Sequence, residues 1–205
     1  MKLQTSVARF MTGWALVLCA IGLWLPPSPA AAQKFEIKPL AEKTLKQLPS
    51  GTLYWRLENF PTLAQAEAAA SPTSLAAEVA GKAWLFTLGP RGGSTRGASK
   101  VAEIGPVPPT SASEYLLRIN RAGGPPGAKT SVHTHPGSEA FYVLAGRVGQ
   151  KTPRGVNHAD AGQSMNGHGA DMPMEVSSSG TTDLDQLVMF VVDASRPFSS
   201  PARFD

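Results

Sequence analysis

The chain has 205 residues, of which 17% are charged and 42% hydrophobic, with a formal net charge of +4. This length suits one domain with an extension, and the composition excludes a coiled coil and an acidic or Lys-rich disordered chain. The 19 Lys and Arg residues are scattered, which argues against a nucleic-acid partner, and the single cysteine, Cys19, excludes a disulfide framework and a cysteine-based zinc site.

Residues 1–32 have the pattern of a signal peptide. Lys2 and Arg9 give a positive start, an apolar stretch follows from Phe10 to Leu25, and Ala30–Ala32 form a small-residue cleavage site before Gln33. The apolar stretch is shorter than the ~20 residues that a bilayer-spanning helix needs. An uncleaved anchor is the alternative. We expect a periplasmic or secreted protein that has no contact with the membrane after cleavage.

Residues 33–109 form the predicted N-terminal extension, with strands and short helices. Phe35–Leu48 is weakly patterned and is expected to run along a surface, whereas Thr52–Phe60 and Ala83–Leu88 are predicted strands. Thr62 and Gln65 form a capping box for a helix that ends at Ser71. Ser71-Pro72 predicts a second short helix that ends at Gly81.

Residues 110–198 are predicted to be all-β, and residues 199–205 are a C-terminal tail. Short strand candidates alternate with Gly/Pro turns, and this spacing is typical of an antiparallel sandwich or barrel. The expected strands are Glu114–Asn120, Thr130–His135, Ala140–Ala145, Val148–Thr152, Met174–Ser177 and Leu184–Asp193. No stretch with helical periodicity follows Thr110.

Two of the four histidines carry the strongest chemical signal. His133 and His135 are two residues apart, so in a strand both imidazoles lie on one face. Pro136-Gly137 then turns the chain, and Glu139 can fold back toward that face. Two imidazoles and a carboxylate suit a divalent metal with open coordination positions, iron(II) or manganese above all. The alternative is a histidine pair on an exposed strand, hydrogen-bonded to water.

The spacing around these residues resembles the first signature motif of the cupin superfamily. The matching positions are Gly127-x5-His133-x-His135-x3-Glu139-x6-Gly146, and the resemblance extends over roughly 115–192. It implies a single cupin jelly-roll β-barrel in which the two histidines and the glutamate converge on one metal position inside the barrel. Because cupins often pair through their sheets, it also suggests a homodimer.

The second cupin motif departs from the family pattern. It opens at Gly162, but His168 stands where the pattern has proline, and Pro173 stands where it has the third histidine, with Met172 one residue earlier. Three interpretations remain open. The metal is held by His133, His135 and Glu139 alone, or His168 is a displaced fourth ligand, or the metal is lost and the barrel is a ligand pocket or a scaffold.

Two functions are compatible with these residues. The first is an exported, metal-dependent oxygenase or related oxidoreductase that acts on a small organic molecule. The second is a non-enzymatic barrel that binds a small ligand or a metal. The sequence offers no separate acid–base pair, nucleophile or phosphate loop beside the metal residues, so it leaves open whether the protein is an enzyme.

Overall fold

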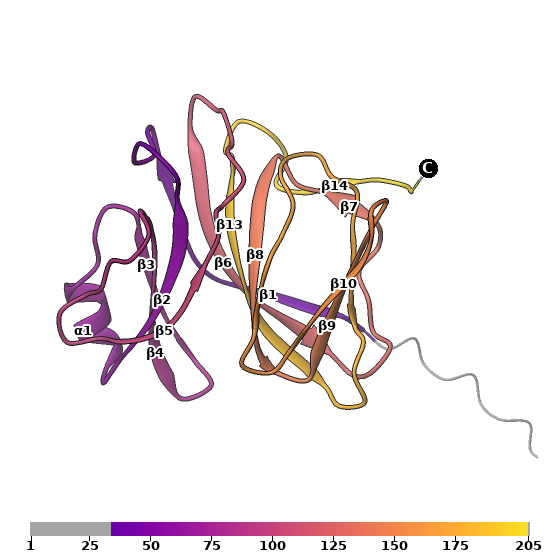
Figure 1. Cartoon of the computed structure of the whole chain (residues 1–205), viewed down its shortest axis with the longest axis horizontal. Helices are drawn as coiled ribbons and strands as arrows, with labels where there is room; N and C mark the ends of the chain where they lie inside the picture. The colour runs from indigo at the N-terminus through magenta and orange to yellow at the C-terminus, as the bar shows by residue number, and fades with distance from the viewer. Residues whose placement is uncertain (1–33, 205) are drawn as a thin grey trace, which may run out of the picture. The chain divides into compact units, whose positions relative to one another are not determined.

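Strands make up most of residues 34–204, which the computed structural model describes (Figure 1). The predicted signal peptide, residues 1–32, lies outside the described residues. Within 34–204, no helix has the length and apolar character required to cross a membrane. The elements are β1 (Glu36–Leu45), β2 (Tyr54–Phe60), α1 (Leu63–Ala68), β3 (Ser74–Val79), β4 (Lys82–Gly89), β5 (Ser99–Ile104), β6 (Tyr115–Gly124), β7 (His133–Thr134), β8 (Gly137–Ala145), β9 (Arg147–Thr152), β10 (Gly155–Asp160), β11 (Ser164–Asn166), β12 (Glu175–Ser178), β13 (Leu184–Asp193) and β14 (Ser200–Pro201).

Two sheets, built mainly from the second half of the chain, face each other. The larger has the order β1-β6-β13-β8-β11 and the smaller the order β10-β9-β12, while β14 pairs with β7. The predicted all-β class is confirmed, but within 34–204 no strand of the larger sheet pairs with a strand of the smaller one, so the barrel is not closed. β1 pairs along β6 and occupies one edge of the larger sheet.

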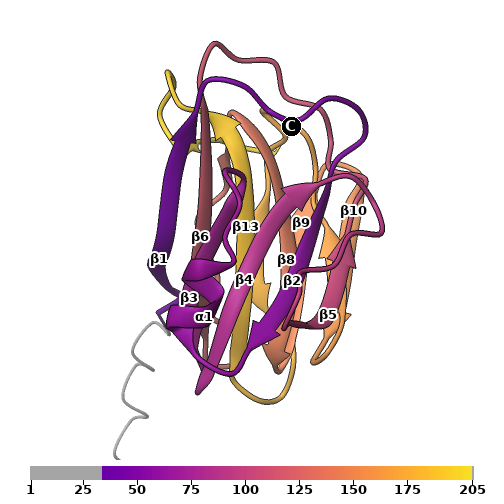
Figure 2. The ribbon, with the colours of Figure 1, turned by 90° about the vertical axis from the view of Figure 1, so that its left-hand side faces the viewer.

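A third sheet covers the outer face of the five-stranded sheet (Figure 2). Its order is β3-β4-β2-β5, and the buried residues of one of its faces share a hydrophobic core with Leu187, Met189 and Val191 of β13. The alternate residues Val188 and Phe190 face the three-stranded sheet instead and belong to a second core. β13 is therefore buried on both faces, which explains its continuous apolar sequence.

The predicted helix over 72–81 is wrong, because this segment contains β3. β3 pairs along its length with β4, and the side chains of Leu75, Ala77 and Val79 are buried at alternate positions. This period of two is that of a half-buried strand. Leu75 and Val79 are four residues apart, a spacing that places them on one face of either a helix or a strand. The pairing with β4 selects the strand.

The other N-terminal predictions have mixed outcomes. The helix capped by Thr62 is confirmed, since the Thr62 hydroxyl accepts a hydrogen bond from the backbone N–H of Gln65 at 3.3 Å, although the helix ends at Ala68. The segment 35–48 does not simply run along a surface, because it contains β1, an edge strand of the five-stranded sheet. Its weak hydrophobic pattern reflects this edge position, where most of its residues stay partly exposed.

Glu58 is a fully buried charge in the four-stranded sheet. Its carboxylate accepts hydrogen bonds from the backbone N–H of Thr95 at 2.7 Å and from the Thr95 hydroxyl at 2.6 Å, and Arg56 Nε lies 3.1 Å from Oε2. Burial alone would raise the pKa of Glu58, but the Thr95 hydrogen bonds and Arg56 outweigh it and lower the pKa below its ordinary value of 4.5.

Replacing Glu58 by glutamine should lower the free energy of unfolding at pH 7 by about 1–3 kcal/mol, because Arg56 loses its charged partner. Since the folded pKa is lowered, the carboxylate stabilises the wild-type protein above pH 4.5, and this contribution is lost as the pH falls through the folded pKa. Glutamine does not titrate, so the difference between the two proteins should shrink in acid. Urea unfolding at pH 7 and at about pH 3.5 measures it, and an equal difference at both pH values would contradict the prediction.

Candidate functional site

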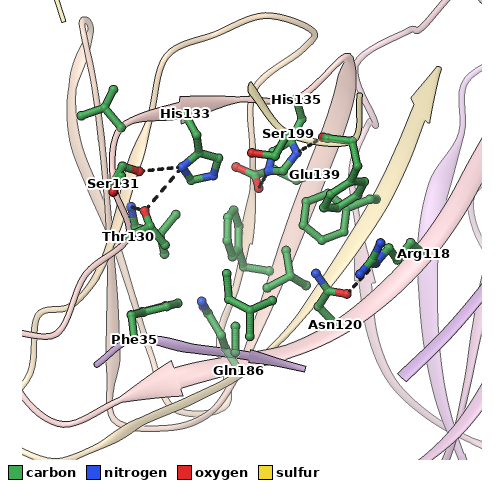
Figure 3. Close-up of a pocket in the computed structure, with 18 of the residues that line it drawn as sticks. Phe35, Arg118, Asn120, Thr130, Ser131, His133, His135, Glu139, Gln186 and Ser199 are labelled. Atoms are coloured by element: carbon green, nitrogen blue, oxygen red, sulfur yellow. Dashed lines mark hydrogen bonds and ion pairs between the residues drawn. The ribbon is translucent and has the colours of Figure 1, made fainter. Parts of the chain in front are cut away.

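A cavity of about 680 Å³ lies between the five-stranded and three-stranded sheets (Figure 3). Its walls are mainly apolar and include four aromatic rings, those of Phe35, Phe141, Phe190 and Phe198. The floor of the cavity is formed by β6, β13 and β8. Every second residue of each strand points into the cavity, and residues that are paired across the three strands lie side by side in rows. A cavity of this size and character is typical of small-molecule sites.

The three predicted metal ligands all line this cavity. His133 lies in β7, His135 follows it, and Glu139 lies in β8 beside Phe190 of β13. The two imidazole rings are 5.0 Å apart between centroids, and His135 Nε2 is 4.0 Å from Glu139 Oε2. The turn at Pro136 brings the carboxylate back toward the histidines, as the sequence predicts.

Backbone carbonyls orient both imidazoles. His133 Nδ1 lies 2.8 Å from the carbonyl oxygen of Ser131, and His135 Nδ1 lies 2.6 Å from that of Phe198. A carbonyl oxygen only accepts, so Nδ1 carries the proton in each ring, and Nε2 keeps its lone pair. This is the arrangement that metal-binding histidines usually have.

The buried pair His135 and Glu139 is uncharged at neutral pH. Burial lowers the pKa of His135 to about 4, with further lowering from His133 and Arg118, although the Phe198 carbonyl opposes it. Burial raises the pKa of Glu139 to about 8, against the opposing hydrogen bond from Gln150. The 4.0 Å contact is therefore a contact between a neutral imidazole and a protonated carboxyl rather than an ion pair.

The donor types at this end of the cavity fit a divalent metal, since they comprise two imidazole nitrogens with free lone pairs and one carboxyl group. Their present placement is incomplete, however. Among residues 34–204, no three His, Cys, Asp or Glu side chains stand close enough together to hold one ion. Gln150 on β9 contributes to this, because its Nε2 donates to Glu139 Oε1 at 2.6 Å and holds the carboxyl toward the three-stranded sheet.

His168 does not line the cavity. It lies in the loop after β11, where burial and the nearby Arg154 lower its pKa, and its buried Nε2 has no hydrogen-bond partner among the described residues. The neighbouring residue, Gly167, leaves no room for a side chain, because a Cβ there would lie 2.6 Å from Glu139 Cγ. The loop therefore packs against the back of Glu139 rather than closing over the cavity.

Sequence reasoning missed Met174, which faces His133. The two residues exchange backbone hydrogen bonds of 2.9 Å in each direction, so their side chains project to the same side. Met174 is buried, and its sulfur lies 3.6 Å from Gln150 Nε2. The motif alignment pointed to Pro173 or Met172, one or two residues earlier, and only the pairing with β7 identifies the residue that lies opposite His133.

No protein-family model matches the sequence, and no curated protein matches it. Several solved structures share part of the chain trace. They include a cupin superfamily protein from Desulfitobacterium hafniense (13% identity, 38% of this chain and 68% of that chain, TM-score 0.34), the DMSP lyase DddQ from Ruegeria pomeroyi (18%, 42% and 43%, 0.37) and the polyketide cyclase RemF from Streptomyces resistomycificus (18%, 43% and 62%, 0.36). The chain spans less than two thirds of the length of the last two.

The geometry of the site agrees with the resemblance of the sequence to the first cupin motif. Two antiparallel sheets face each other across the cavity, and the segment 127–146, which resembles the motif, contains β7 and β8 and places its two histidines and its glutamate on the cavity wall. The two motif glycines adopt a left-handed backbone conformation that favours glycine, since Gly127 and Gly146 have φ values of +84° and +72°. A Cβ at Gly146 would also collide with the carbonyl of Asp183.

Proposed function

We propose that this protein is an exported, cupin-type metal-binding protein that acts as an oxygenase or related oxidoreductase on a small organic molecule. His133, His135 and Glu139 are the ligands of the metal, iron(II) or manganese. The observation that carries the proposal is the orientation of the two imidazoles, whose Nδ1–H groups donate to backbone carbonyls while their Nε2 atoms stay free on the cavity wall.

A metal bound here would supply open coordination positions for dioxygen and substrate. The chain's own residues do the rest. The Ser131 and Phe198 carbonyls hold the imidazoles in one tautomer, and Gln150 holds the Glu139 carboxyl. The Phe190 and Phe198 rings pack against each other at 4.9 Å and against His135, and so exclude water from one side of the centre.

The non-enzymatic small-ligand or metal-binding barrel is the second candidate. It is favoured by one observation, namely that no three potential ligands within 34–204 form a ready metal site. In that case the protonated Glu139 and the neutral His135 serve as hydrogen-bonding groups for a ligand in the cavity. The oxygenase requires a metal in the isolated protein, whereas a barrel that binds a small ligand does not.

Protein isolated from the periplasmic fraction should begin at Gln33 and contain about one iron or manganese ion per chain. N-terminal sequencing and elemental analysis of the same sample measure these two properties. The leader pattern and the Ala30–Ala32 site are the reason for the first, and the imidazole arrangement is the reason for the second. An intact Met1 would contradict export, and a protein that contains no metal and takes none up on dialysis would support the binding barrel.

A further inference from the structure

Gln186 is a buried amide that no protein group satisfies. It lies in β13 with none of its surface exposed, and both its Oε1 and its Nε2 have no hydrogen-bond partner among residues 34–204. It lines the cavity at the end opposite the histidines (Figure 3). Buried side-chain amides in proteins nearly always have partners, so an amide with two unpaired groups on a cavity wall indicates that the partner comes from outside the chain.

The residues around Gln186 explain why it has no protein partner. Its neighbours across the sheet are Ala122 on β6 and Val143 on β8, which offer no polar side chain. Asn120, in the next row of the floor, already accepts a hydrogen bond from Arg118 Nε at 3.0 Å. The amide therefore lies unpaired at an apolar end of the cavity.

The distance between the two polar ends of the cavity follows from the strand register. Phe190 lies beside Glu139, and Gln186 lies four residues earlier on the same strand. Four residues of antiparallel strand span ~13 Å. A ligand that reaches both ends thus needs an apolar body of about this length, and the aromatic rings of the wall suit a planar or aromatic body.

We propose that Gln186 recognises the polar end of the ligand of this cavity, and that this end is a neutral carboxamide. This inference rests on the proposed function, since it names the substrate class of the same cavity. A primary amide presents one donor and one acceptor side by side, and so pairs with both groups of the Gln186 side chain. A carboxylate fits less well, because it has no donor for Oε1 and because Arg118, the cationic residue on the described part of the cavity wall, is already engaged. The Arg118 guanidinium contacts Asn120, Glu42 at 3.5 Å and the Phe198 ring at 4.4 Å.

The test uses two probes with one skeleton, 4-phenylbutanamide and 5-phenylpentan-2-one, in which a methyl group replaces the amide nitrogen. Calorimetric titration of the mature protein, with and without EDTA, measures both affinities. The wild-type protein should bind the amide at least about tenfold more tightly than the ketone, because only the amide satisfies both groups of Gln186. In Gln186→Leu the ratio should fall to about one. The exposed Gln47 lies outside this cavity, so Gln47→Leu should keep the wild-type ratio.

Three outcomes would overturn the inference. Equal affinities in the wild-type protein would mean that water satisfies the amide, and a preference that survives in Gln186→Leu would place the recognition elsewhere. A wild-type protein that binds neither probe would show that the cavity does not admit this class. Because the ratio is also measured in EDTA, it does not depend on the metal, so failure of the metal proposal and failure of this inference are distinguished.

Discussion

Replacing His133 by alanine should abolish stable metal binding, with a loss of affinity of at least about a hundredfold. Only one imidazole and one carboxylate would remain, and two protein ligands rarely hold a divalent ion against buffer. His133 is the cleaner position for this test than His135, because it is half-buried, whereas His135 packs between Phe190 and Phe198 and its loss would leave a hole. Competition with a chromophoric chelator measures the affinity, and elemental analysis after dialysis measures the retained metal.

His168→Ala is the matched control for this experiment. His168 does not line the cavity, so its removal should leave the metal content and the affinity close to those of the wild-type protein. Thermal unfolding of both variants verifies that each is folded. Equal metal loss in His133→Ala and His168→Ala would show that His168 is the displaced fourth ligand, and would contradict the three-ligand site.

Replacing Phe86 by alanine should lower the free energy of unfolding by about 3–5 kcal/mol. Phe86 on β4 has no exposed surface and belongs to the core that joins the four-stranded sheet to the outer face of the five-stranded sheet. Its ring also stacks on Trp84 at 6.0 Å. Removing it creates a cavity in the layer that supports the strands of the candidate metal site from behind. The midpoint and slope of urea unfolding measure the change.

The control for Phe86 is Val156, which is 52% exposed on β10. Val156→Ala should change the free energy of unfolding by no more than about 0.5 kcal/mol, as exposed substitutions usually do. A loss below about 1 kcal/mol in Phe86→Ala would mean that the four-stranded sheet does not stabilise the five-stranded sheet, and that the shared core is not formed in solution.

Local sequence patterns were sufficient for much of the second half of the chain. The strand prediction over 184–193 matches β13 in both bounds, because a long apolar run between turn residues has few alternatives. The meeting of His133, His135 and Glu139 in one cavity was also predictable. All three lie within seven residues around one turn, so the local chain geometry brings them to the same cavity wall.

The N-terminal half was less predictable because its strands are defined by distant partners. β1 pairs with β6, which lies about 80 residues later in the chain, and β3 became a strand because β4 offers it a pairing edge. The spacing of Leu75 and Val79 is compatible with either structure. Hydrogen bonds to another strand decide between helix and strand here, and a local sequence pattern carries no information about these bonds.

By itself, the sequence determined the all-β class of the second half, the resemblance to the first cupin motif, the departure from the second one and the candidate metal ligands, because each depends on residue type and short spacing. Only the tertiary structure decided that Met174 faces His133, that Gln150 holds Glu139, and that Gln186 lies unpaired at the far end of the cavity. These three facts depend on which strands lie beside one another and in which register. A shift of one residue would turn each of these side chains to the opposite face of its sheet.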